Sequence, residues 1–165
     1  ALRGLFSAVS TEPVSFVNAP QIAEEGGVSI EVDTHTEALT HRSVVTVRAV
    51  TADGDVTSIS GALTGLDNVE LIIVIYCRNF DMRAVGHNVV LSYQDRPGAL
   101  GLFATALGNA DVDIISCALS PDAKGTGATA LLRLNRALTE DEMETVSSAV
   151  GQLVLPRWIS RECHD

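Results

Sequence analysis

The chain has 165 residues, of which 46% are hydrophobic and only 4% aromatic, and its formal net charge is −10. This length and composition exclude a disordered chain and fit one domain or two small ones with an aliphatic core. The acidic balance argues against nucleic acid and anionic membranes as partners, because both are bound through basic patches. No apolar run reaches the roughly 18 residues of a membrane span, and no signal-peptide layout is present, so we expect a cytoplasmic protein.

The first half of the chain predicts helices followed by a mostly antiparallel sheet. Residues 2–10 have helical apolar spacing without a preceding cap, so we expect the chain to begin inside a larger protein. Asn18 is the predicted cap of a second helix that runs to Glu25. Alternating apolar residues predict strands at 28–32, 43–50, 56–63 and 71–76. The pair Asp53-Gly54 is a hairpin signal, and residues 80–86 are interpreted as the link to the second half.

The second half predicts the element order of a ferredoxin-like domain. Its periodicities predict a strand, a helix, two strands, a helix and a weak last strand, at residues 88–93, 97–109, 112–119, 128–134, 139–151 and 153–159. This order is βαββαβ. The expected fold class is therefore α+β, with a truncated, mostly antiparallel α/β sandwich domain at 1–87 and a ferredoxin-like domain at 88–162.

The stretch from Tyr93 to Gly101 turns from a strand into a helix. Pro97 is placed near the first helical position, and Gly98 lets a backbone or a ligand approach closely. The free N–H groups of a helix start suit a small anion such as an amino-acid carboxylate. An ordinary strand-to-helix turn capped by Asp95 is the alternative that these residues leave open.

Several motifs resemble one known family. The run YQDRPGALGLFATALGNADVDIISC resembles the first βαβ unit of an ACT domain, a small amino-acid-sensing module with an Asp-Arg-Pro-Gly signature. The chain also resembles the C-terminal regulatory region of long-type D-3-phosphoglycerate dehydrogenases, through LRGLFSAV, VSFVNAP, HRSVVTVRAV, FDMRA and GATALLRL. The resemblance implies part of the intervening, allosteric domain at 1–87 and an ACT domain at 88–162. The last dozen or so residues look unlike the family.

The resemblance also implies an effector site for a small amino acid, L-serine. It assigns the site to Tyr93, Asp95, Arg96, Pro97, Gly98, Ala99, Leu100 and, on the second strand, Asp113. The family has an asparagine where this chain has Asp113. An ionised Asp113 accepts hydrogen bonds but donates none, so a donor toward the ligand carboxylate is lost.

An anion site between the two domains is implied in the same way. The resemblance assigns it to Arg83 and Arg133, which are otherwise read as two surface arginines. Leu71 stands where the family has a lysine. Because an apolar side chain cannot donate to phosphate, we expect this site to be weakened or lost.

No catalytic, metal or cofactor site is expected in the chain. A Gly-x-Gly-x-x-Gly fingerprint is missing, the four histidines are scattered, and no nucleophile stands beside a base. The resemblance implies that the longer enzyme, and not this segment, uses NAD in serine biosynthesis.

The segment itself is expected to act in allosteric regulation and to form a homo-oligomer, with 89–93 or 113–117 near the contact. A purely structural oligomerisation module without a ligand is the alternative.

Overall fold

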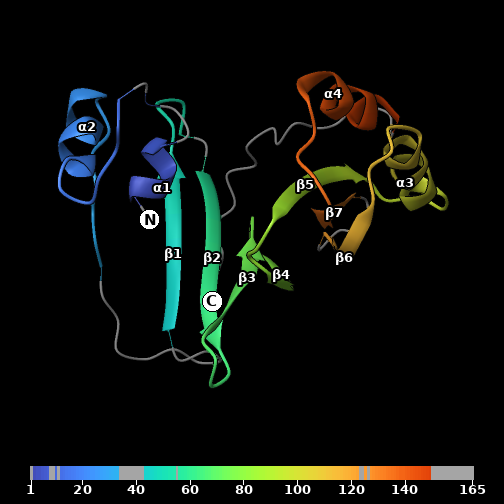
Figure 1. The fold of residues 1–165 in the computed structure, drawn as a ribbon, viewed down its shortest axis with the longest axis horizontal. Coiled ribbons are helices and arrows are strands. Elements are labelled where there is room, and N and C mark those ends of the chain that lie inside the picture. Colours follow the sequence, from blue (N-terminus) through green and yellow to red (C-terminus); the bar gives the residue numbers. More distant parts are fainter. Residues whose placement is uncertain are drawn as a thin grey trace. The chain divides into compact units, whose positions relative to one another are not determined.

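The computed structural model describes residues 2–149 apart from 8–9, 11, 34–42, 55, 123–124 and 126. Figure 1 shows its elements in chain order: α1 (Leu2–Ser7), α2 (Ala19–Glu25), β1 (Ser43–Val50), β2 (Val56–Thr64), β3 (Val69–Ile75), β4 (Arg78–Arg83), β5 (His87–Gln94), α3 (Ala99–Asn109), β6 (Ile114–Pro121), β7 (Gly127–Leu134) and α4 (Glu140–Ala149). The chain divides into two compact units, one ending at Leu39 and one beginning at Thr40. None of the helices in the described residues is long and apolar enough to cross a membrane.

The first unit contains α1 and α2. Asn18 precedes α2 as predicted, but its side chain accepts a 2.6 Å hydrogen bond from the Ser15 N–H instead of capping the helix. The prediction of a strand at 28–32 is wrong, because residues 28–33 have no secondary structure and are exposed. Alternation specifies the two faces of a strand, but a strand also needs a neighbour that satisfies its backbone groups.

Sheet A contains four antiparallel strands in the order β1-β2-β3-β4. The hairpin predicted around Asp53-Gly54 is confirmed, with a register that runs from Ser43 opposite Leu63 to Val50 opposite Val56. Gly54 has φ +84°, a conformation that glycine adopts without strain. The interpretation of 80–86 as a link is wrong for residues 80–83, which belong to β4.

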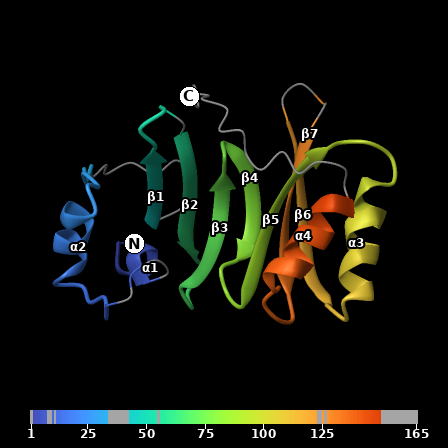
Figure 2. The same ribbon diagram turned by 90° about the horizontal axis from the view of Figure 1, so that it is seen from above.

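Sheet B has the strand order β5-β7-β6, with both pairs antiparallel. Counted from β5, this is the 1-3-2 order of the ferredoxin-like plan, which confirms the predicted α+β fold class. Helices α3 and α4 pack on one face of this sheet (Figure 2), where Phe103, Leu132 and Val146 share one core. The last strand predicted at 153–159 lies outside the described residues.

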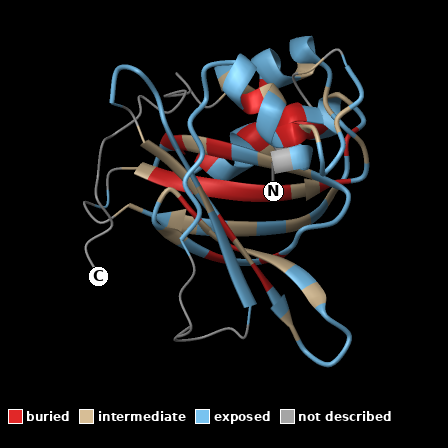
Figure 3. Cartoon of the chain, turned by 90° about the vertical axis from the view of Figure 1, so that its left-hand side faces the viewer, coloured by how far each residue is buried: buried red, intermediate tan, exposed pale blue. Residues whose placement is uncertain are grey.

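The other face of sheet B contacts β4. Leu131 of β7 is fully buried in a cluster with Ile75, Phe80 and Met82. The guanidinium of Arg78 donates a hydrogen bond to Oγ1 of Thr129, which is also fully buried. Because both faces of β7 are covered, every residue from Ala128 to Leu132 is buried. Figure 3 colours buried residues red. The boundary expected after residue 87 falls at the first residue of β5, inside the second compact unit.

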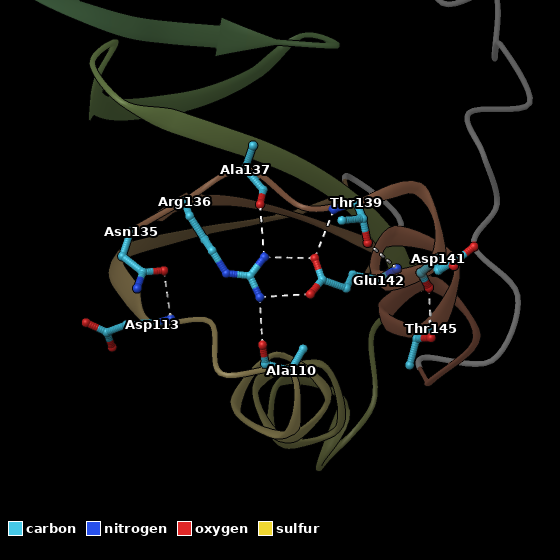
Figure 4. A network of polar contacts seen from close by, with 9 residues as sticks. All are labelled: Ala110, Asp113, Asn135, Arg136, Ala137, Thr139, Asp141, Glu142 and Thr145. Atoms are coloured by element: carbon cyan, nitrogen blue, oxygen red, sulfur yellow. Dashed lines mark hydrogen bonds and ion pairs between the residues drawn. The ribbon is translucent and has the colours of Figure 1, made fainter.

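A polar clamp joins the end of α3 to the start of α4 (Figure 4). Thr139 and Glu142 form a capping box, in which the Glu142 carboxylate accepts from the Thr139 N–H at 2.9 Å and the Thr139 hydroxyl accepts from the Glu142 N–H at 3.3 Å. Arg136 donates to both carboxylate oxygens of Glu142, at 2.8 and 2.9 Å, and to the Ala110 carbonyl at 2.7 Å. The clamp therefore confirms the helix start predicted at Thr139.

Acid is expected to release this clamp. The hydrogen bond from Arg136, followed by that from the Thr139 N–H, lowers the pKa of Glu142 from 4.5 to about 2. Because the folded-state pKa is depressed, the contribution of Glu142 to stability is present above pH 4.5 and is lost as the pH falls toward 2. Hydrogen exchange of α4 should therefore accelerate as the pH falls from 4.5 toward 2. In Glu142→Gln, the exchange rate should depend less on pH. Identical pH profiles for the native chain and Glu142→Gln would show that Glu142 is not the group responsible.

Candidate effector site

The loop that the sequence singles out lies at the end of sheet B. It leaves β5 after Gln94 and enters α3 through Gly98, the N-cap, which has φ +89°. The helix begins at Ala99, so Pro97 lies two residues before it, and Asp95 is not its cap. The Ala99 N–H donates to the Arg96 carbonyl at 3.1 Å. The first helical hydrogen bond runs from the Leu102 N–H to the Gly98 carbonyl at 3.1 Å, so the N–H groups of Leu100 and Gly101 are the ones placed for an anion.

Tyr93 supports this loop from the core. Its side chain is buried and meets Phe103 of α3 edge to face, with ring centroids 5.7 Å apart. Burial first, then the negative charge of Asp95 and the nearby Cys117, raise the pKa of the Tyr93 hydroxyl. In a single copy of the chain, the Tyr93 ring therefore packs in the core and fixes the strand from which the loop starts.

Asp95 and Asp113 lie at opposite ends of sheet B. Asp95 follows Gln94, which pairs with Gly127, whereas Asp113 precedes Ile114, which pairs with Leu134 at the His87 end. Eight residues of extended strand separate the two ends by about 25 Å. Within one copy, the structure does not bring these two expected ligand contacts together.

Asp113 is exposed, and its backbone is held by Asn135 (Figure 4). The Asn135 side chain accepts from the Asp113 N–H at 3.1 Å, and the Asn135 N–H donates to the Asp113 carbonyl at 3.1 Å. In the described part of the chain, no hydrogen bond or ion pair engages the Asp113 carboxylate. It is open to a ligand or to another copy of the chain.

The two arginines of the expected anion site lie on different faces. Arg83 is the cross-strand partner of Leu71, and alternation along β4 places it on the face of sheet A opposite Met82. Arg133 lies on the face of sheet B that contacts β4, where it donates to the Ser116 hydroxyl at 3.1 Å. Its Nε is buried without a partner.

Arg78 is the arginine of β4 that reaches sheet B, and sequence reasoning missed it. The alternation Arg78-Phe80-Met82 is the signal that would have found it.

A lysine at position 71 should create an anion site beside Arg83. Cross-strand partners have Cβ atoms roughly 5 Å apart, so Leu71→Lys places an ammonium group next to the guanidinium. We expect phosphate binding to tighten by roughly 1.5–3 kcal/mol, the value of a hydrogen bond to a charged group. Calorimetric titration with phosphate measures this, with Leu71→Gln as the uncharged control. Equal affinities in the three proteins would show that this pair forms no anion site.

The fold and its loop define a class of protein. The chain is an α+β protein in which an antiparallel sheet precedes a ferredoxin-like sheet covered by two helices. The sequence profile of the D-3-phosphoglycerate dehydrogenase intervening domain matches residues 1–75. By sequence, the chain matches a segment of the D-3-phosphoglycerate dehydrogenases.

Three relatives show how much of such an enzyme the chain matches. The chain is 51% identical to the D-3-phosphoglycerate dehydrogenase of Mycobacterium leprae, covering 92% of this chain and 29% of that protein. For the enzyme of Mycobacterium tuberculosis strain H37Rv, the values are 51%, 91% and 28%. For that of Bacillus subtilis strain 168, they are 26%, 93% and 29%. The chain thus spans under a third of the length of these relatives.

Proposed function

We propose that this segment is the amino-acid-sensing and self-associating regulatory region of a D-3-phosphoglycerate dehydrogenase. In this proposal, residues 88–162 are an ACT domain, residues 1–87 are part of the intervening domain, and the effector is L-serine. The 51% identity to the mycobacterial enzymes supports the assignment. The effector contacts are Tyr93, Asp95, Arg96, Pro97, Gly98, Ala99, Leu100 and Asp113.

One observation carries the proposal: the expected ligand contacts are divided between the two ends of sheet B. They meet only if two copies combine. When two β6 edges pair antiparallel about a two-fold axis, the Asp113 end of one copy lies beside the Pro121 end of the other. Asp113 then lies three strand spacings, about 14 Å between backbones, from the strand that leads to the partner's loop. One small ligand and two aspartate side chains span this gap.

The β6 edge has the exposed apolar surface that such pairing needs. Among the described strands, β6 pairs only with β7, so its other edge is open. Ile115 and Leu119 on this strand are 52% and 46% exposed, and Leu100 and Leu102 of α3 are 44% and 42% exposed. Open strand edges with apolar side chains associate with other strands unless they are protected. We therefore place the homo-oligomer contact at β6.

The anion site belongs to the same regulatory region. The buried, unpaired Nε of Arg133 supports a ligand at that arginine, because an orphaned donor costs about 1–3 kcal/mol until an acceptor meets it. Arg83 is the proposed second contact of this ligand. Because Arg83 lies on the face of sheet A that points away from Arg133, it reaches the ligand only if β4 moves.

The activity of the longer enzyme is part of the proposal. It oxidises 3-phosphoglycerate with NAD, in the cytoplasm, at the start of serine biosynthesis. In this proposal, NAD binds to another part of that enzyme, because this sequence has no dinucleotide fingerprint. The present segment contributes regulation and assembly.

Mixing two inactive variants should restore serine binding. Asp95→Ala and Asp113→Ala should each abolish binding, because each removes one half of both sites in a symmetric dimer. In an equal mixture, half of the dimers are mixed, and each has one intact site, so about a quarter of the sites should bind. Calorimetric titration with L-serine after equilibration of the mixture measures this. Binding by the native chain without recovery in the mixture would place the site within one copy.

A structural oligomerisation module is the second candidate function. The packing of Tyr93 into the core favours it, because a buried ring offers its hydroxyl to a ligand less readily than an open one. The same titration distinguishes the candidates. A dimer that binds neither serine nor glycine, alanine or threonine would support the structural module.

A further inference from the structure

Asn135 lies beside Asp113 at the open end of the β6–β7 pair. It is the first residue after β7, and two hydrogen bonds of 3.1 Å hold the pair, one from the Asp113 N–H to Asn135 Oδ1 and one from the Asn135 N–H to the Asp113 carbonyl. Figure 4 shows Asn135 and Asp113 beside each other, joined by the dashed bond from the Asp113 N–H to the Asn135 side chain. Both residues are exposed. A carboxylate and an amide are thus fixed at one end of the sheet.

Chemistry determines which end of the Asn135 amide is free. A backbone N–H can be met only by an acceptor, so the atom that faces Asp113 N must be the oxygen. The Nδ2 group, with its two N–H donors, is therefore turned away from that bond. In the described part of the chain, no acceptor engages Nδ2. It supplies the type of donor that an ionised Asp113 lacks.

The neighbouring Arg136 is not available for this role. Its two terminal nitrogens donate to both oxygens of Glu142 and to the carbonyls of Ala110 and Ala137. Those bonds belong to the clamp between α3 and α4. Asn135 is therefore the open donor beside Asp113.

We propose that Asn135 is a specificity-determining residue of the effector site. In this proposal, the Asp113–Asn135 pair binds both charged groups of an α-amino acid. The Asp113 carboxylate accepts from the α-ammonium group, and Asn135 Nδ2 donates to the α-carboxylate. The first-turn N–H groups of Leu100 and Gly101 in the partner copy bind the same carboxylate from the other side. This inference rests on the proposed function, and it adds a contact that the sequence resemblance does not assign.

The pair predicts discrimination against ligands that lack one charged group. Ethanolamine is L-serine without its carboxylate, so it keeps the contact to Asp113 and loses the contact to Asn135. Asn135→Asp tests the second contact cleanly, because a carboxylate oxygen still accepts from the Asp113 N–H while the donor is gone. The double exchange Asp113→Asn with Asn135→Asp restores one amide and one carboxylate at unchanged net charge.

Calorimetric titration of L-serine and ethanolamine into the native chain and these variants tests the proposal. In Asn135→Asp, the preference for serine over ethanolamine should fall at least tenfold, the range expected for a hydrogen bond to a charged group. The double exchange should recover most of the preference. An unchanged preference in Asn135→Asp, with serine binding intact, would overturn the role of Asn135 and leave the proposed function standing. Absence of serine binding by the native chain would contradict both the role of Asn135 and the proposed function.

Hydrogen exchange at the ends of β6 and β7 provides the structural control. Protection there should be the same in Asn135→Asp and in the native chain, because the bond to the Asp113 N–H is retained. Asn135→Ala, which loses that bond as well, should fray the strand ends. A loss of serine preference in Asn135→Asp that appears only together with fraying would show that Asn135 is merely structural.

Discussion

Replacing both Ile115 and Leu119 by glutamate is expected to convert the proposed dimer into a monomer and to abolish the proposed serine binding. The two side chains lie on the open edge strand β6 and are 52% and 46% exposed. In an antiparallel pair of β6 edges, the two glutamates of each copy face those of the other at close range. Like charges across an interface cost several kcal/mol, so the dissociation constant should rise by more than a hundredfold.

Sedimentation velocity at micromolar concentration measures the state of the chain, and a thiol reagent reports the register. The register that sets Asp113 beside the partner's Pro121 also sets Cys117 beside the partner's Cys117. Cys117 is a free, exposed thiol, so a short bismaleimide should cross-link the native chain if it forms the proposed dimer. Cys117→Ser should prevent the cross-link. Val45→Glu adds a charge to an exposed valine of β1, 61% exposed, and serves as the matched control that should remain dimeric. A monomeric native chain would contradict the proposed contact.

The elements with a strong local pattern could be predicted from the sequence. The strand at 43–50 was predicted to the residue, because its alternation ends beside an Asp-Gly turn signal. The helix at Ala99–Asn109 and the strands around it were also predicted, with ends that differ by one or two residues. Helical and strand periods, bounded by turn residues, determine such segments locally.

The errors in the fold arise where pairing decides the structure. Residues 28–32 alternate without a strand partner, whereas β4 alternates Arg78, Phe80 and Met82 and pairs with β3. The polar residues that alternate with Phe80 and Met82 make this strand resemble a linker in sequence. Their role becomes visible only when Leu131 of sheet B covers them. A local pattern cannot specify a contact made by residues some fifty positions away.

The candidate site shows the same limit. The loop at Asp95 to Gly98 has its own signal, the passage from a strand to a helix through Pro97 and Gly98. The separation of Asp95 and Asp113 depends on strand order, and the order β5-β7-β6 is a property of the whole sheet. Asn135 has no local signal either, because its relation to Asp113 exists only through the pairing of β6 with β7.

Phe103→Ala is expected to have the largest effect on stability. The Phe103 side chain is fully buried where α3 meets sheet B, and it contacts the Tyr93 ring edge to face. Removing a buried phenylalanine costs about 3–5 kcal/mol through lost transfer free energy and the remaining cavity. A loss of this size is a large fraction of the stability of a small domain.

The loss of stability should be concentrated in the ferredoxin-like half and should extend to the loop between β5 and α3. Tyr93 loses its ring partner, and α3, whose first turn provides the Leu100 and Gly101 amides, loses its main anchor to the sheet. Urea denaturation followed by circular dichroism measures the change, and hydrogen exchange locates it. Phe103→Leu, which keeps most of the volume, should cost clearly less, and Thr105→Ala on the exposed side of α3 should cost little. If Phe103→Ala destabilised β1 and β2 as strongly as β5 and β7, the two sheets would unfold as one cooperative unit, and the apolar cluster around Leu131 would be the contact that joins them.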